Sequence, residues 1–237
     1  MTEILLNLVL GLVTAAMGTG FGWFSRTFLY RRELRRTQRF FGLPPGAECL
    51  LVVNRDFGGA ADSVARNDTY ALLELAGLVK ECGAGFEVAA HDETRQGIGE
   101  RTEFCVGGPR SNRRMAAHLA VSLPGFSIEG EVDFAVAGTS YRMERGAAEY
   151  VLLARVAPGA GRHPLFLLCG QRSVANQAAA RYLAREHPRL ARTHGVDGVF
   201  CLLLKVVNSE AYGPDAVEVV ADVSGAAVRT SPGGRTG

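Results

Sequence analysis

The sequence lacks the cysteine patterns of disulfide frameworks and of zinc sites. Its five cysteines are an odd number, they are widely spaced, and no two of them form a C-x-x-C pair. Four lie in short apolar runs typical of buried strands, where cysteine behaves as a small hydrophobic residue: Cys49, Cys105, Cys169 and Cys201. The cysteines therefore indicate a reducing compartment and no structural metal.

Other signatures are missing as well. The net charge is only +2 over 237 residues, which argues against a dedicated nucleic-acid-binding protein. No G-x-G-x-x-G fingerprint, no G-x-S-x-G nucleophile elbow and no metal-ligand spacing of histidines occurs. The sequence thus predicts no cofactor, no metal and no nucleic-acid partner. A hydrophobic content of 47% with 21% charged residues excludes wholesale disorder.

The first long feature is an apolar run. Residues 4–24 are almost uninterrupted hydrophobic sequence, in which Asn7 is the one strongly polar side chain. A helix of this length spans about 30 Å, the thickness of the hydrocarbon layer of a bilayer. The sequence therefore predicts a transmembrane anchor at residues 1–25 and a basic juxtamembrane segment and linker at residues 26–48. A cleaved signal peptide is the alternative, although its basic amino-terminal region is missing.

Charges beside this run set its orientation. Arginines cluster on its carboxyl-terminal side: Arg26, Arg31, Arg32, Arg35, Arg36 and Arg39. Because basic residues stay on the cytoplasmic side, we expect a single-pass protein of the cell membrane, with Met1 outside and the following domain cytoplasmic. The lipid bilayer is its expected partner. Gly18 and Gly22 form a G-x-x-x-G that predicts a homodimer, unless these glycines are simply those common in membrane helices.

Apolar strands alternate with helices between residues 49 and 223. This alternation predicts a mostly parallel, mixed Rossmann-like α/β sheet with flanking helices and one antiparallel hairpin around residues 128–143. The expected strands are 49–54, 86–90, 103–106, 150–156, 165–169, 200–207 and an edge strand at 216–223. The expected helices are 69–81, one ending near residue 120, and one from residue 173 that Pro188 stops at about residue 186. Residues 224–237 are expected to be a disordered tail.

One turn sequence occurs twice. GPRS at residues 108–111 matches GQRS at residues 170–173, and the match continues with Asn112 and Asn176. Each copy follows an apolar strand that has a cysteine near its end, and each opens a helix. Turns that follow parallel strands gather along one edge of a sheet, which is where ligands bind. We therefore expect both turns to face one pocket.

The chemistry of these turns suits an anion. Backbone N–H groups at a helix start and a forked arginine donor both bind phosphate or carboxylate. The expected ligand-binding residues are Gly107, Gly108, Arg110, Ser111, Asn112, Gly170, Arg172, Ser173, Asn176 and, from the loop after the first strand, Asp56. Helix capping alone is the competing interpretation of the serines and asparagines.

A polar triplet follows the second strand. In His91, Asp92 and Glu93, a carboxylate could act as general base beside a bound anion, so Asp92 and Glu93 are the catalytic candidates. A solvated turn is the plainer interpretation. The other histidines, including His118 and His187, have no partner that the sequence identifies.

The anchor, followed by CLLVVN and later by EFCVGGPRSN, resembles uncharacterised single-pass membrane proteins of actinobacteria over residues 1–207. The GGPRSN turn also looks like the phosphate-side loops of nucleotide-sensing Rossmann-like domains. The leading hypothesis is a membrane-tethered cytosolic domain that binds or senses an anionic, nucleotide-like small molecule. A hydrolase or transferase for a phosphorylated or glycosidic substrate is the second hypothesis. A membrane scaffold without a small-molecule ligand is the third.

Overall fold

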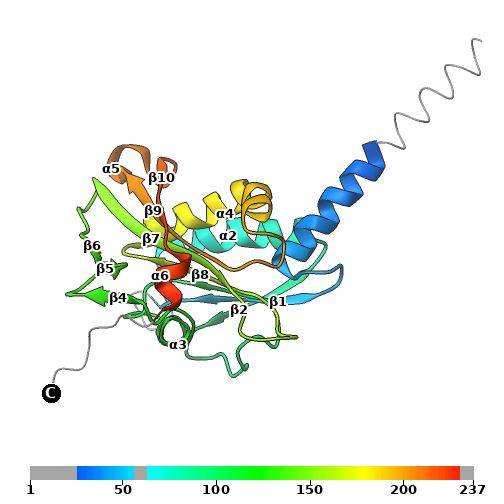
Figure 1. The fold of residues 1–237 in the computed structure, drawn as a ribbon, viewed down its shortest axis with the longest axis horizontal. Helices are drawn as coiled ribbons and strands as arrows, with labels where there is room; N and C mark the ends of the chain where they lie inside the picture. The colour runs from blue at the N-terminus through cyan, green and yellow to red at the C-terminus, as the bar shows by residue number, and fades with distance from the viewer. Residues whose placement is uncertain (1–25, 56–62, 230–237) are drawn as a thin grey trace, which may run out of the picture.

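A seven-stranded sheet forms the centre of the protein in the computed structural model, which describes residues 26–55 and 63–229 (Figure 1). The strand order is β10 (Val217–Asp222), β9 (Phe200–Val207), β7 (Ala148–Val156), β8 (Leu165–Gly170), β3 (Glu103–Val106), β1 (Glu48–Val53) and β2 (Gly85–Ala90). Strands β2, β1, β3 and β8 are parallel, whereas β7, β9 and β10 are antiparallel to their neighbours. The expected mixed α/β class is confirmed.

The strands lie where the apolar runs predict them. Strands β3 and β8 are buried along their whole length, as is β1 after Glu48, because both faces of this part of the sheet are covered. Strand β10 alternates apolar and polar residues and forms one edge of the sheet, as predicted. All five cysteines are free and buried.

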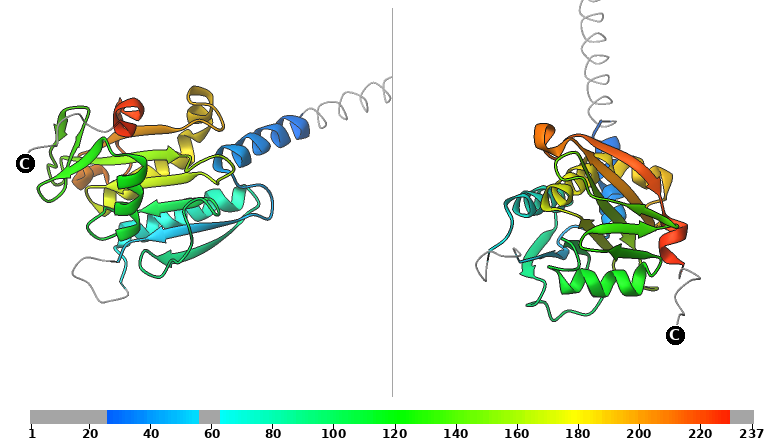
Figure 2. Two further views of the ribbon diagram at one scale, coloured as in Figure 1. Left: turned by 60° about the horizontal axis from the view of Figure 1, so that its bottom comes forward. Right: turned by 90° about the vertical axis from the view of Figure 1, so that its left-hand side faces the viewer.

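Helices and a small second sheet cover the two faces (Figures 1 and 2). On one face, α2 (Arg66–Glu81), α4 (Ser173–Thr193) and the end of a helix at residues 26–41 share a hydrophobic core with the sheet. On the other face lie α3 (Arg113–Ser122), α6 (Ser224–Val228) and strands β4 (Phe126–Glu129), β5 (Asp133–Val136) and β6 (Thr139–Tyr141). The short α5 (Ser209–Tyr212) connects β9 to β10.

The predicted hairpin is present as strands β5 and β6. Its turn residues Ala137 and Gly138 both have positive φ values, 57° and 75°, as the tight turn of a two-residue hairpin requires. Strand β4 pairs with β5, so the hairpin belongs to a separate three-stranded antiparallel sheet and does not extend the central one.

Helix α4 does not stop before Pro188, and this prediction was wrong. The helix continues to Thr193 and buries Leu190 on its last turns. A proline inside a helix leaves the carbonyl four residues earlier without its N–H donor. Here His187 Nδ1 lies 2.9 Å from that carbonyl, the one of Ala184, and can donate to it. A side chain therefore replaces the missing backbone hydrogen bond.

Residues that the sequence assigned to a linker belong to the core. Phe40, Phe41 and Leu43 are fully buried, and the helix at residues 26–41 that leads to them projects from the body of the domain (Figure 2). Within residues 26–55 and 63–229, no helix combines the length and apolar character needed to cross a bilayer. The predicted anchor, with Gly18 and Gly22, lies outside the described residues.

The end of the chain also departs from the prediction. A disordered tail was expected from residue 224, but residues 224–228 form α6, which buries Ala227 against the second core. Ser224 Oγ also accepts a hydrogen bond from the backbone N–H of Cys201 at 2.8 Å. Residues 230–237 lie outside the described part of the chain.

Candidate functional site

The two GxRS turns meet in space. Strands β3 and β8 are adjacent and parallel, so the turns that follow them emerge at the same edge of the sheet. A Cβ atom added to Gly108 would lie only 3.4 Å from the carbonyl oxygen of Gly170. Residues separated along the chain by a helix, a small sheet and two strands are therefore neighbours.

A cavity of about 600 Å³ opens between these turns and the small sheet. Seven of the residues predicted to bind a ligand line it: Gly108, Arg110, Ser111, Gly170, Arg172, Ser173 and Asn176. The small sheet and its β4–β5 turn add the apolar lining residues Ile128, Val132 and Phe134. Gly107 and Asn112 are not among the lining residues, and Asp56 lies outside the described chain.

Arg110 brings a positive charge to this cavity from the first of the two turns. Its side chain is exposed, and Nη1 donates a hydrogen bond of 3.0 Å to the carbonyl oxygen of Glu131. That acceptor is neutral, and no carboxylate within the described residues is hydrogen-bonded to Arg110. The guanidinium is therefore held in place without being neutralised, as an anion-binding arginine requires.

Arg172 is different, because a buried acid already neutralises it. Its Nη1 lies 2.5 Å from Oε1 of Glu149, whose side chain is fully buried, while 35% of the Arg172 side chain is exposed. The backbone N–H of Gly146 donates to the same carboxylate oxygen at 3.1 Å. Arg172 therefore adds little positive charge to the cavity. Arg145 also lines it, as do the acids Asp68 and Glu131, so its overall charge suits a ligand with a single anionic group.

The two helix starts are not equivalent. At α3, Asn112 Oδ1 accepts from the N–H of Met115 at 2.9 Å, and His91 Nδ1 accepts from the N–H of Arg113 at 3.3 Å. Capping therefore accounts for Asn112. At α4, the N-cap Arg172 makes no side-chain cap bond, so this helix start keeps N–H groups for a ligand.

Asn176 fastens the second turn. Its Oδ1 accepts from the N–H of Gly170 at 2.7 Å, and its Nδ2 donates to Asp68 Oδ1 of α2 at 2.8 Å. The side chain is buried and both ends of its amide are used. Asn176 therefore holds the cavity wall in place, and we assign ligand contact to the residues beside it.

Asn54 is a pocket residue that the sequence analysis missed. It follows β1 directly, and its Nδ2 donates to Ser111 Oγ at 3.2 Å, while its buried Oδ1 has no partner among the described residues. Gly107, with a φ of 113°, is needed beside it, because a Cβ there would lie 2.8 Å from Asn54 Cγ. The signal was available: Asn54 is the first polar residue after a buried strand, at the same sheet edge as the turns.

No protein-family model, curated protein or solved structure matches the chain.

The catalytic candidates lie away from this cavity. Asp92 and Glu93 both bind Arg55, whose Nε is 3.1 Å from Asp92 Oδ2 and whose Nη2 is 2.8 Å from Glu93 Oε1. The hydrogen bonds from Arg55 lower the pKa of Asp92, which makes it a poorer base. Neither acid lines the cavity of Arg110.

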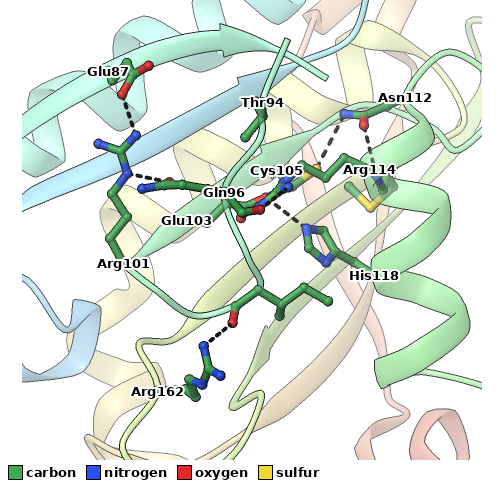
Figure 3. Close-up of polar contacts among 12 residues, drawn as sticks. Glu87, Thr94, Gln96, Arg101, Glu103, Cys105, Asn112, Arg114, His118 and Arg162 are labelled. Carbon is green, nitrogen blue, oxygen red and sulfur yellow. Dashed lines mark hydrogen bonds and ion pairs between the residues drawn. The ribbon is translucent and has the colours of Figure 1, made fainter. Parts of the chain in front are cut away.

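A second polar cluster, also unforeseen, is buried under α3 (Figure 3). Glu103 accepts hydrogen bonds at both carboxylate oxygens from Arg114, at 2.7 and 2.6 Å, and lies 2.9 Å from His118 Nε2. The sequence analysis found no partner for His118, and that was wrong. Burial raises the pKa of Glu103, but the hydrogen bonds from Arg114 and His118 outweigh it and hold the pKa below its usual value.

The same cluster brings together the ligand types of a metal site, but these ligands are not free to bind a cation. Ligand atoms of Glu103, Cys105 and His118 lie within 4.8 Å of one another. Both oxygens of Glu103 are already bound by Arg114, however, and burial raises the pKa of the Cys105 thiol well above its usual value. A cation would have to displace an arginine, so the arrangement is that of a buried ion pair that attaches α3 to β3.

Proposed function

We propose that this protein is a membrane-tethered binding domain for a small molecule that joins one anionic group to an apolar, nucleoside-like part. The observation that carries the proposal is the position of Arg110. It lies where two strand-to-helix turns meet, in a cavity of about 600 Å³, with no carboxylate of the described residues bound to it. Small-molecule sites typically enclose about 300–1,000 Å³.

The two walls of the cavity suit the two parts of such a ligand. Arg110 and the open start of α4 lie together, and both favour negative charge. Ile128, Val132 and Phe134, from the small sheet and its β4–β5 turn, add an apolar surface to the same cavity. A ligand with a phosphate or carboxylate at one end and a base-like ring at the other would contact both walls.

Ligand binding to the full-length chain tests the proposal. We expect a nucleotide or sugar-phosphate from a broad panel to raise the melting temperature, and isothermal titration to give a saturable site. Arg110→Ala removes the charge-assisted contact and should weaken binding about tenfold or more, since such bonds contribute about 1.5–3 kcal/mol.

Arg113→Ala is the matched control, because Arg113 is exposed on α3 and does not line the cavity. It should leave the affinity unchanged. Arg172→Ala is a poorer test, since it leaves the buried Glu149 without its partner and destabilises the fold. Saturable binding that Arg110→Ala does not weaken would exclude this cavity as the site.

The tether rests on the apolar run at residues 4–24 and on the helix that follows it. Phe28, Leu29 and Tyr30 are exposed at the described start of this helix, between Arg26 and Arg31. Aromatic residues beside basic ones are typical of the membrane interface on the cytoplasmic side. Carboxyl-terminal fusions to green fluorescent protein and to alkaline phosphatase test the orientation: we expect fluorescence from the first and no activity from the second.

A further inference from the structure

A second cavity, of about 610 Å³, lies at the opposite end of the central sheet. It forms where the helix at residues 26–41 meets the end of β7 and the start of β8. Strand β8 begins beside this cavity at Leu165 and ends at Gly170, in the cavity of Arg110. The two cavities are therefore separated by the length of a strand.

Arg155 of β7 is the main feature of this second cavity. The residue is only 4% exposed, and its guanidinium packs over the rings of Phe40 and Phe166. Its Nε donates to the Phe40 carbonyl at 3.1 Å and its Nη1 to the Gly198 carbonyl at 2.6 Å. Both acceptors are neutral, and no carboxylate of the described residues is hydrogen-bonded to Arg155.

A buried charge of this kind calls for a counter-ion. Arginine has five N–H donors, and the two carbonyls occupy only part of this set. Burial lowers the pKa of Arg155, and nearby Asp197 opposes the shift, yet an arginine stays charged in proteins. Asp197 itself is bound by Arg39, whose Nε lies 3.3 Å away. The positive charge of Arg155 is thus left largely uncompensated.

The rim of the cavity adds further positive charge. Its lining includes four arginines and one acid: Arg35, Arg39, Arg155, Arg162 and Asp197. Four positive charges less one negative charge leave three positive charges. Among the described residues, the acceptor bound by Arg162 is the neutral carbonyl of Ile98, at 3.2 Å, and no carboxylate there is hydrogen-bonded to it. Planar guanidinium groups around a cavity bind the oxygens of phosphate well.

We propose that this cavity is a phosphate-binding site, with Arg155 at its base and Arg35 and Arg162 at its rim. The phosphate can belong to a dissolved phosphorylated compound or to the headgroup of an anionic phospholipid. The basic helix that lines the cavity leads to the predicted anchor. If the tether proposed above is correct, this helix brings the cavity close to lipid headgroups. The site itself does not depend on that tether.

Titration of the full-length chain with inorganic phosphate tests the site. All measurements use the Arg110→Ala background, which weakens phosphate binding in the first cavity, so that binding that depends on Arg162 reports on the second cavity. We expect one saturable phosphate site whose affinity falls about tenfold in Arg162→Gln and further in Arg35→Gln/Arg162→Gln. Arg155→Gln should abolish binding but also removes two hydrogen bonds to the fold, so the exposed rim residues carry the test. Arg185→Gln, on an exposed part of α4, is the matched control.

The source of the phosphate is resolved by two ligands that share a headgroup. Glycerol 3-phosphate and soluble dioctanoyl phosphatidic acid are titrated in the same background. Tighter binding of the lipid assigns the site to a membrane headgroup, whereas equal binding assigns it to a dissolved phosphate, and both must require Arg162. The proposal is overturned if phosphate does not saturate, or if Arg162→Gln binds it as tightly as the control.

Discussion

Two buried carboxylates of the described residues are each held by an arginine. Glu103 is bound by Arg114 and Glu149 by Arg172, and both acids are almost wholly inaccessible to solvent. Removing one partner of such a pair leaves an uncompensated charge in a medium of low polarity. That loss is larger than the net contribution of the intact pair.

Glu103→Gln is therefore expected to destabilise the fold by about 3–5 kcal/mol at pH 7, because Arg114 stays buried without its carboxylate. Equilibrium unfolding in urea measures the change. Glu87→Gln is the control, because the Glu87 side chain is largely exposed. Its ion pair with Arg101 should contribute less than about 1 kcal/mol to the free energy of unfolding. Similar losses in the two variants would contradict the assigned role of Glu103.

The same pair predicts how stability depends on pH. The pKa of Glu103 is lower in the folded chain than in the unfolded chain, where it is about 4.3. Its contribution is thus fully present above that value and is lost as the pH falls through the folded pKa. The difference in unfolding free energy between the wild type and Glu103→Gln should be largest at neutral pH and should shrink below about pH 4.

Gly107 is a glycine of the site that is expected not to tolerate a side chain. Alanine there meets both an unfavourable φ of 113° and Asn54 Cγ at 2.8 Å, so we expect a loss of about 2–4 kcal/mol. Gly130→Ala separates the effect of the positive φ from the effect of the steric contact. Gly130 has a φ of 56°, but no atom lies within 4 Å of the added Cβ, so this substitution should cost about 1 kcal/mol. Thermal or urea unfolding of both variants measures the difference.

Some residue roles were accessible from the sequence and others were not. Arg110 and Arg172 were found because helix starts after parallel strands converge by a general rule. The sequence did not reveal that Glu149 neutralises Arg172, because nothing local marks an acid on a distant strand as its partner. For the same reason, the pairing of Asp92 and Glu93 with Arg55 could not be predicted.

At the scale of elements, α4 offers a test of how a helix accommodates proline. His187→Ala should cost about 1 kcal/mol, because the Ala184 carbonyl loses the hydrogen bond that replaces the one missing at Pro188. Pro188→Ala restores a backbone N–H and should stabilise the helix by about 1–3 kcal/mol. In the Pro188→Ala background, the cost of His187→Ala should fall by about that 1 kcal/mol, while the loss of the contacts with Phe40 and Phe41 remains. Additive effects in this double-mutant cycle would show that His187 does not satisfy that carbonyl.

Element positions were predicted well where an apolar period determines them. The strands at residues 103–106 and 200–207 have the predicted bounds, since buried strands give continuous apolar runs. The error at Pro188 arose from a rule about local propensity that tertiary packing overrides. The helix at residues 26–41 was missed because its arginines were interpreted as the basic flank of a membrane anchor, and not as the polar face of a helix.

For the whole molecule, the five cysteines report on global folding. All are buried, and burial raises the pKa of Cys49 to about 12 and that of Cys82 to about 11. Only the thiolate attacks a disulfide reagent. We therefore expect no rapid reaction of the native chain with dithiobis-nitrobenzoate at pH 8, and five reactive thiols after unfolding. A thiol that reacts rapidly in the native state would contradict the buried placement.

The arrangement of the sheet lay beyond the sequence. An apolar run predicts a buried strand whichever way it points, so β7 carries no local sign that it is antiparallel to β8 and β9. Its direction depends on contacts between residues far apart in the chain. The separation of the small sheet, which supplies apolar residues to the first cavity, also depends on such distant contacts and could not be predicted.

Strand β7 runs from the first cavity to the second, so its length sets the distance between them. This strand has Glu149 beside the first cavity and Arg155 in the second, and six residue steps of extended chain cover about 20 Å. A metabolite of ordinary size cannot span that gap, so the two cavities would fill independently. If the Arg155 end rests on lipid headgroups, the other cavity opens up to about 20 Å farther from the bilayer, where it binds dissolved compounds.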